Sequence, residues 1–354
     1  MERLSEKEWK DFSYEKFFAL QKQKNKLSVT DCTDEGLIPV YASQSQNNGV
    51  MGFTTAKQEI DVKQYPYLVF GDHTRCMNLA KYSFSAADNV KILKTNELSM
   101  DELTFIATAW KKRIPDMGYA RHWRKARTVG ISLPVDDTGN PDYAYMTIYS
   151  TEVRGGMLMR YKNFITGQLS QLEYKDIPAL GEKKWKPIPI VSLFKELKPG
   201  KGHGLNHLTK INDGISYIGA TNRDNGVLCF IQEDEMSRNM KQPGNCIGFI
   251  KNGDGSAGYA IYKAEPFVST SDVIYGYANW LNRYTGLFFV AAQDLIEHKY
   301  SHGYKRNQQH LRGDKVMLPV TDAGKPDYEY MEQYAKNMML HKYEQYLAFI
   351  ESGR

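Results

Sequence analysis

The chain contains an internal repeat, and no other feature of the sequence limits its fold as strongly. Residues 118–149 align without a gap on residues 303–334. Both copies contain the frame G-Y-x-R followed by L-P-V-x-D-x-G-x-P-D-Y-x-Y-M-x-x-Y. A length of 354 residues leaves room for two domains of ordinary size, each with its own core. The repeat therefore predicts two homologous domains rather than one large domain.

Weaker matches extend the repeat toward the start of each half. Trp9 matches Trp185, and Asn48-Gly49-Val50 matches Asn225-Gly226-Val227. The spacing between matched residues drifts from 176 to 185, as insertions in loops would cause. We therefore expect two homologous halves that meet near residue 177.

Each half has the same expected order of elements, a β-rich stretch followed by a helix. In the first half, Ser99 and Glu102 form a capping-box pattern that starts this helix. In the second half we expect the helix over residues 281–300. The basic segment, the Leu-Pro-Val strand and a glycine turn come next, and Pro141 and Pro326 suit the first turn of another helix.

A long helical pattern begins at each of these prolines. Apolar residues three and four positions apart form a narrow stripe along it, which is typical of a seam between two helices. Each copy is the obvious partner of the other, and Gly155-Gly156 predicts a kink in the first copy. The expected fold class is α/β (α+β). The expected boundaries are a first domain over 1–140, a spacer helix with linker over 141–177, a second domain over 178–325 and a second spacer helix over 326–354.

Composition is that of a folded protein with no sign of membrane insertion or secretion. Hydrophobic residues make up 42% of the chain and charged residues 25%. No apolar run approaches the roughly 18 residues of a membrane span, and the first residues are charged. The four cysteines include no C-x-x-C pair, which argues against a disulfide framework and a thiolate zinc site. We expect a cytoplasmic chain with reduced thiols and no membrane partner.

Several short strings are similar to catalytic motifs, and a structural explanation is favoured for each. Asn140-Pro141-Asp142-Tyr143 is one letter from the N-P-P-Y of amino-methyltransferases, but the second copy has Lys325 in place of the asparagine. Residues 253–258 match G-x-G-x-x-G, yet a β-like stretch follows instead of the helix that a dinucleotide needs. A tight loop that approaches DNA is better supported there.

Nuclease and zinc motifs are equally weak. The two Pro-Asp pairs lack a suitable (D/E)-x-K partner, and helix starts explain them better. His203 with His207, and His298 with His302, have helical metal spacing but lack the rest of a zinc motif. We therefore expect no catalytic residues and no metal site in this chain.

Positive charge is concentrated beside the repeated frame. The net charge is only +5, but residues 111–127 contain seven Lys or Arg against one Asp. A solvated helix face is the ordinary explanation of such a window. The repeat favours another, because the frame is preserved while residues 121–125 (RHWRK) differ from residues 306–310 (RNQQH). Arg pairs well with guanine, and Asn or Gln with adenine, so divergent loops on one frame suit two different half-sites on duplex DNA.

A family resemblance rests on segments spread over nearly the whole chain. They are Tyr67–Thr74 with Phe84–Val90, Asn47–Phe53, the openings at Trp9 and Trp185, and both L-P-V…G-x-P-D-Y-x-Y-M segments. In these the chain resembles the specificity subunits of type I restriction-modification systems. Its short length makes it more similar to the separate specificity subunit of type IIB (BcgI-like) systems.

The resemblance implies two target recognition domains, each an α/β unit with a curved sheet. It also implies that the long helices pair as an antiparallel coiled-coil spacer with pseudo-twofold symmetry. A chain of this family would be non-catalytic and would choose a bipartite site on double-stranded DNA, at the nucleoid of a prokaryotic cell. Its partners would be methyltransferase (M) or fused restriction-methyltransferase subunits, which would use S-adenosylmethionine and Mg²⁺.

The DNA-contacting faces of the family come from loops of each domain, which implies two sets of residues here. The first set is Asn48, His73, Thr74, Arg75, Arg121, Trp123, Arg124 and Lys125, and the second is Asn225, Lys251, Asn252, Ser256, Lys305, Arg306, Asn307 and Gln308. Two alternatives from other classes stay open. One is a stand-alone DNA methyltransferase or nuclease, and the other is a repeat scaffold that binds proteins.

Overall fold

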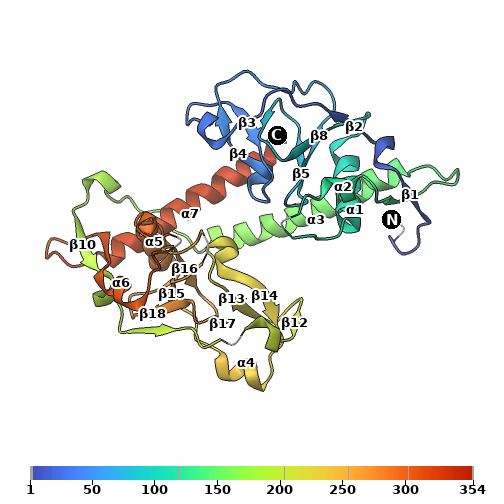
Figure 1. Ribbon diagram of the computed structural model, residues 1–354. Helices are drawn as coiled ribbons and strands as arrows, with labels where there is room; N and C mark the ends of the chain where they lie inside the picture. Colours follow the sequence, from blue (N-terminus) through green and yellow to red (C-terminus); the bar gives the residue numbers. More distant parts are fainter. Residues whose placement is uncertain (1–2, 119, 203, 254, 302, 353–354) are drawn as a thin grey trace. The chain divides into compact units, whose positions relative to one another are not determined.

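The chain divides into two compact units (Figure 1), Met1–Tyr161 (unit 1) and Lys162–Arg354 (unit 2). The structure is a computed structural model, and it describes residues 3–118, 120–202, 204–253, 255–301 and 303–352. The division falls inside the first long helix. Each unit is built from small sheets and helices around its own core, as the α+β prediction requires.

Over its described residues, unit 1 begins with eight strands, continues with two helices and a further strand, and ends in a long helix. The elements are β1 (Trp9–Phe12), β2 (Phe18–Gln21), β3 (Ile38–Tyr41), β4 (Val50–Thr54), β5 (Tyr67–Gly71), β6 (Met77–Ala80), β7 (Ser85–Ala86), β8 (Val90–Thr95), α1 (Met100–Arg113), α2 (Trp123–Ala126), β9 (Ile131–Pro134) and α3 (Tyr143–Leu169), whose end belongs to unit 2.

Unit 2 repeats this order and adds a short strand and a short helix. Its elements are β10 (Trp185–Pro189), β11 (Glu196–Pro199), β12 (Lys210–Ile211), β13 (Ile215–Ile218), β14 (Val227–Ile231), α4 (Glu235–Met240), β15 (Cys246–Ile250), β16 (Ala260–Lys263), β17 (Val268–Ser269), β18 (Val273–Tyr277), α5 (Arg283–Asp294), α6 (Gln308–Gly313), β19 (Lys315–Pro319) and α7 (Tyr328–Glu351).

The strand order confirms that the two units are copies of one fold. The four-stranded sheet β2-β8-β5-β6 of unit 1 corresponds to β11-β18-β15-β16 of unit 2, and both are antiparallel. The sheet β4-β3-β7 corresponds to β14-β13-β17, with the last pair parallel in each unit. The pair β1-β9 corresponds to β10-β19. Even the register shift next to the end of β3 recurs in β13, where such a bulge bends the strand.

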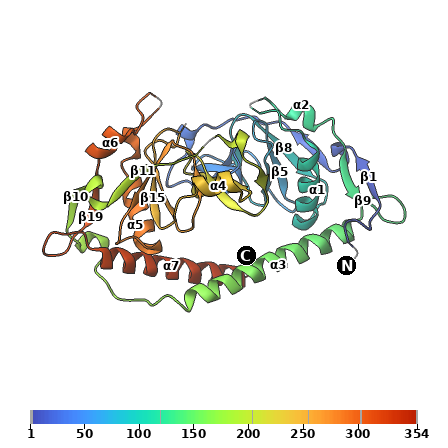
Figure 2. The same cartoon turned by 90° about the horizontal axis from the view of Figure 1, so that it is seen from below.

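Helix α1 of unit 1 and its counterpart α5 of unit 2 pack against corresponding strands, β6 and β9 in unit 1 and β16 and β19 in unit 2. The predicted capping box of α1 is present, with Ser99 and Glu102 each bonded to the other's backbone amide. Helix α1 lies beside β9 (Figure 2) and also contacts β6. It places Trp110, which is 0% exposed, in a stack with Tyr14 and Phe18 at ring-centroid distances of 5.6 and 5.5 Å. The apolar residues whose spacing predicted this helix, Leu103, Ile106 and Trp110, therefore form its buried face.

The later helices differ from their predictions in detail. The helix expected over 281–300 is shorter, because α5 ends at Asp294 and a separate 3-10 turn covers Glu297–Lys299. Helix α3 is continuous through Gly155 and Gly156, and the predicted kink at these glycines stays a prediction. The pairing of the long helices as a coiled coil stays a prediction. Among the described residues, no helix is both long and apolar enough to span a bilayer.

The repeated Pro-Asp pairs start the long helices, as predicted. Asp142 accepts a hydrogen bond from the Tyr145 amide at 2.9 Å and pairs with Lys7 at 2.9 Å. In unit 2, Asp327 accepts from the Tyr330 amide at 3.1 Å and pairs with Lys183 at 2.7 Å. Each aspartate therefore satisfies a free backbone donor at a helix start and ties that start to the first segment of its unit.

This arrangement predicts the stability of unit 1 after substitution at Asp142. Asp142→Ala should lower the free energy of unfolding by about 1–2 kcal/mol, because both the helix cap and the Lys7 ion pair are lost. Asp142→Asn should cost less, since its amide oxygen can still cap the helix. Urea unfolding measures both, and Asp137→Ala in the exposed turn is the control. An Asp142→Ala variant as stable as the control would contradict this role.

Candidate nucleic-acid interface

In unit 1, two of the predicted DNA-contacting segments are joined directly. The His122 amide donates to the Asp72 carbonyl oxygen at 2.8 Å, and the Trp123 amide donates to the Asp72 carboxylate at 2.7 Å. Asp72 follows strand β5, and His122 precedes helix α2; both are buried. The loop with His73 and Thr74 and the segment with Arg121 therefore lie together, although about fifty residues separate them in the chain.

The exposed side chains of this surface are polar or basic. His73, Thr74, Arg121, Arg124 and Lys125 are exposed, as a surface for DNA requires. We call this set, with Asp72 and His122 beneath it, the unit 1 loop surface. The exposure agrees with the prediction, but individual DNA contacts stay predictions.

Arg75 supports this surface from one side. Its guanidinium donates to the Ile114 carbonyl at 2.8 Å and to the Asp116 carboxylate at 2.8 Å, and its backbone has a left-handed φ of 57°. A hydrogen bond from the Gly118 amide and the charge of Arg75 hold the pKa of Asp116 below its usual range. Arg75 therefore ties the β5–β6 turn to the end of helix α1.

The ring of Trp123, which was predicted to contact DNA, packs against aromatic side chains within the protein. Its ring packs on Phe70 at 5.6 Å, on Tyr14 at 5.5 Å and on Trp110 at 6.3 Å, all between ring centroids. These rings belong to or pack against the main core of unit 1. Aromatic residues bury much apolar area, and the Trp123 ring is partly buried here, so its contact with DNA stays a prediction. A tryptophan between arginines gave no sequence signal that could separate the two roles.

The matched asparagines Asn48 and Asn225 anchor turns. Both have left-handed backbones, with φ of 49° and 51°. The Asn48 side chain donates to the Leu79 carbonyl at 2.9 Å, and Asn225 donates to the Tyr262 carbonyl at 2.9 Å. The repeat therefore preserves Asn48 and Asn225 in turns that bond a neighbouring strand. Both residues were predicted from the sequence to contact DNA.

Unit 2 joins its loops in the same way. The Arg306 amide donates to the carbonyl of Lys251, which follows strand β15, at 3.0 Å. Lys305, Asn307 and Gln308 are exposed beside it, and the Asn307 side chain also caps helix α6. We call these three residues, with Lys251 and Asn252, the unit 2 loop surface.

Loop residues of β15–β16 have partners within the protein. The Lys251 ammonium donates to the Ser271 carbonyl at 2.9 Å, and Asn252 donates to the Asp272 carboxylate at 3.4 Å. Ser256 is 5% exposed and donates to Asn222 at 3.0 Å, so its prediction as a DNA contact is wrong in this arrangement.

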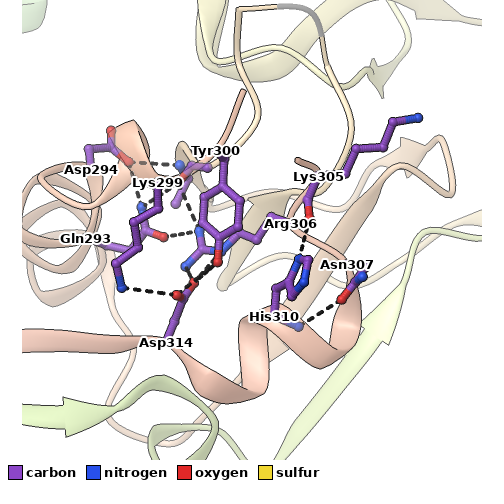
Figure 3. Close-up of polar contacts among 11 residues, drawn as sticks. Gln293, Asp294, Lys299, Tyr300, Lys305, Arg306, Asn307, His310 and Asp314 are labelled. Atoms are coloured by element: carbon purple, nitrogen blue, oxygen red, sulfur yellow. Dashed lines mark hydrogen bonds and ion pairs between the residues drawn. The ribbon is translucent and has the colours of Figure 1, made fainter. Parts of the chain in front are cut away.

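Arg306 is the largest departure from the predicted site. It is 0% exposed, and its guanidinium faces Asp314, Gln293 and the Gly258 carbonyl (Figure 3). A wholly buried guanidinium cannot reach a base or a phosphate, so the predicted DNA contact is wrong. Sequence reasoning missed its partners because a buried polar residue has no pattern that distinguishes it from a surface one.

The motifs set aside on sequence grounds fit their structural explanations. The glycine-rich string from Gly253 leads into strand β16, with no helix after it. Within the described residues, no three His, Cys, Asp or Glu side chains gather into a metal site. His203 and His302 of the histidine pairs lie outside the described residues.

Asp294 accepts a hydrogen bond from Gln293, which in turn bonds Arg306. The Asp294 carboxyl should make the free energy of unfolding depend on pH. Burial raises the pKa of its carboxyl to about 6, against hydrogen bonds from the Ala260 amide and Gln293. The unfolded value is about 3.9. The folded chain therefore holds the proton more tightly, and stability falls as the pH rises from about 4 to about 6, with the full cost remaining at pH 7.

Asp294→Asn stays neutral at every pH, and its amide oxygen can accept both hydrogen bonds. The variant should raise the free energy of unfolding at pH 7 by about 1 kcal/mol, reduced from the full linkage value because Asp294 is partly exposed. Urea unfolding at pH 4 and pH 7 measures this. If the difference in free energy of unfolding between Asp294→Asn and wild type is the same at pH 4 and pH 7, Asp294 does not titrate in this range.

No protein-family model matches the chain. The chain is 26% identical over 290 residues to the type II restriction enzyme specificity subunit S.BcgI from Heyndrickxia coagulans, covering 80% of each.

Two solved structures are also similar. The type I restriction-modification S subunit from M. genitalium is 14% identical, with a TM-score of 0.46 over 99% of this chain and 94% of that one. The HsdS subunit from Thermoanaerobacter tengcongensis is 10% identical, with a TM-score of 0.32 over 98% and 91%. The chain is thus similar in sequence to a restriction-modification specificity subunit over four-fifths of both proteins.

Proposed function

We propose that this chain is the DNA sequence-specificity subunit of a restriction-modification system and that each unit recognises one half of a bipartite site on duplex DNA. One observation carries the proposal most directly. Two copies of one fold present their loop surfaces at corresponding places, after β5 and before α2 in unit 1, and after β15 and before α6 in unit 2.

The chemistry of the two loop surfaces differs where their scaffolds agree. Unit 1 presents Arg121, Arg124 and Lys125, whereas unit 2 presents Lys305, Asn307 and Gln308. Basic side chains suit phosphates and guanine, and amides suit adenine. A preserved scaffold with divergent exposed side chains is what recognition of two unlike half-sites needs.

We assign methyl transfer and cleavage to partner subunits, with S-adenosylmethionine and Mg²⁺ bound there. The matched Pro-Asp pairs, which are closest to catalytic motifs, cap helices and pair with lysines. The chain would then act as the part of the complex that selects the site, in the cytoplasm where the genome lies.

Arg121 tests the DNA contact of unit 1. Arg121→Ala should weaken binding by about 1–3 kcal/mol and relax one half-site if the guanidinium contacts a base. If it contacts only phosphate, affinity should fall evenly for all sequences and the salt dependence should become shallower. Selection from random duplex DNA, with the chain bound to its methyltransferase partner, separates these results.

Arg113→Ala is the matched control, because Arg113 belongs to the same basic window but pairs with Asp11 at 2.8 Å. Binding by Arg121→Ala that equals binding by this control would remove Arg121 from the interface. A wild-type complex that selects no sequence at all would contradict the proposed function and favour a protein-binding scaffold.

A groove in unit 1 supports the assignment of a protein partner. It has a volume of about 710 Å³, lies between α1 and α3, and is lined mainly by apolar side chains. Trp9, Phe105 and Tyr149 line it, and so do Val153 and Met157, whose exposed fractions of 45% and 59% are typical of its edge. We assign this groove to apolar side chains of the partner methyltransferase subunit.

A charge at this edge should release the partner. Val153→Asp should reduce co-purification of the methyltransferase by about tenfold or more, because an unpaired carboxylate would be buried in the contact. Glu152→Ala, at the neighbouring exposed position of α3, is the control. Equal recovery of the partner with both variants would place the contact elsewhere.

A further inference from the structure

The buried Arg306 of unit 2 has no part in direct DNA contact, yet it is held by an extensive polar network (Figure 3). Its Nε donates to Asp314 Oδ2 at 2.9 Å, and its Nη2 lies 2.8 Å from the same oxygen as an ion pair without hydrogen-bond geometry. Its Nη1 donates to the Gly258 carbonyl at 2.9 Å and to Gln293 Oε1. The planar guanidinium thus binds groups on three sides.

The partners of Arg306 are themselves held in place. The Tyr300 hydroxyl lies 2.9 Å from both Asp314 oxygens, and Lys299 approaches Asp314 at 3.5 Å from the surface. Gln293 donates to the Gly258 carbonyl at 3.1 Å. Burial lowers the pKa of Arg306, and the Asp314 carboxylate opposes that effect. A buried pair of this kind is costly to break on one side, because the other charge then has no partner.

Arg306 joins the two segments of the unit 2 loop surface. Its amide bonds the Lys251 carbonyl, directly after β15, and its guanidinium bonds the Gly258 carbonyl, shortly before β16. One residue therefore holds both ends of the β15–β16 loop. Its chain neighbours Lys305 and Asn307 are exposed, so the same residue sets where those side chains lie.

The helix position that holds Gln293 in unit 2 has a different kind of side chain in unit 1. Trp110 and Gln293 both stand eleven residues after the N-cap of their helix, Ser99 for α1 and Asn282 for α5. In unit 1 that position is an aromatic side chain within the apolar core. In unit 2 it is an amide that bonds the Gly258 carbonyl. Apolar packing is non-directional, whereas hydrogen bonds fix direction, so the two loops are positioned by different means.

We propose that Arg306 is a positioning residue for sequence recognition by unit 2. It clamps the β15–β16 loop to residues 305–308 so that both present one fixed surface to DNA. The inference rests on the proposed function, because it supplies the reason that unit 2 recognises its own half-site. Arg306 acts through Lys305, Asn307 and Gln308 and does not touch the bases itself.

Two variants remove the clamp in different ways. Arg306→Lys keeps the charge but lacks the fork that reaches Gly258 and Asp314 together. The double variant Arg306→Met with Asp314→Leu replaces the buried ion pair by apolar side chains, a change that commonly preserves folding. Lys299→Met is the matched control, since it removes only the half-exposed outer cation.

The first readout is hydrogen exchange of the full chain bound to its methyltransferase partner. Amides of residues 255–259 and 303–308 should exchange at least about tenfold faster in both clamp variants than in Lys299→Met, while unit 1 stays protected. This measurement needs no DNA. Unchanged exchange in both loops of a folded clamp variant would overturn the clamp.

The second readout is sequence selection from random duplex DNA. The clamp variants should lose about tenfold or more in discrimination at one half-site, keep the other half-site, and bind non-specific DNA within about twofold of wild type. Full discrimination at both half-sites by a variant with faster loop exchange would overturn the positioning role. If the wild-type complex selects no site at all, the proposed function is contradicted. The hydrogen-exchange result would still show whether Arg306 holds the two loop segments together.

Discussion

One backbone hydrogen bond in each unit makes the candidate interface possible. The amide before helix α2 or α6 donates to the carbonyl after strand β5 or β15, as His122 to Asp72 and Arg306 to Lys251. The loop after strand β5 or β15 and the segment before helix α2 or α6 are thereby brought together. Side-chain bonds strengthen the same junction, from the Trp123 amide to the Asp72 carboxylate in unit 1 and from the Arg306 guanidinium to the Gly258 carbonyl in unit 2.

The repeat made most of the fold predictable from the sequence. The spacing of the Leu-Pro-Val and Pro-Asp-Tyr frames correctly placed the β9 and β19 strands and the starts of α3 and α7. The capping box at Ser99 correctly placed α1. Local signals of this kind work because the hydrogen bonds that start a helix are made by residues close in the chain. The end of α5 at Asp294 had no such local signal.

The candidate site was predictable at the level of loops but not of side chains. Residues 73–74 and 121–125 do lie close together, yet Trp123 packs against the core and Arg306 is buried. In both cases the deciding factor is a long-range partner. Trp123 has Phe70 and Trp110, and Arg306 has Asp314 and Gln293. Sequence spacing cannot show these partners, because the fold brings them together from different elements.

The central claim is that two copies of one scaffold select two unlike half-sites for a partner methyltransferase. Methylation sequencing of a host genome tests it most directly, with the chain expressed together with the methyltransferase encoded beside it and, for comparison, with the methyltransferase alone. The account predicts a methylated split motif that appears only when this chain is present. A genome with no new motif, while the partner is soluble and bound to its cofactor, would contradict it.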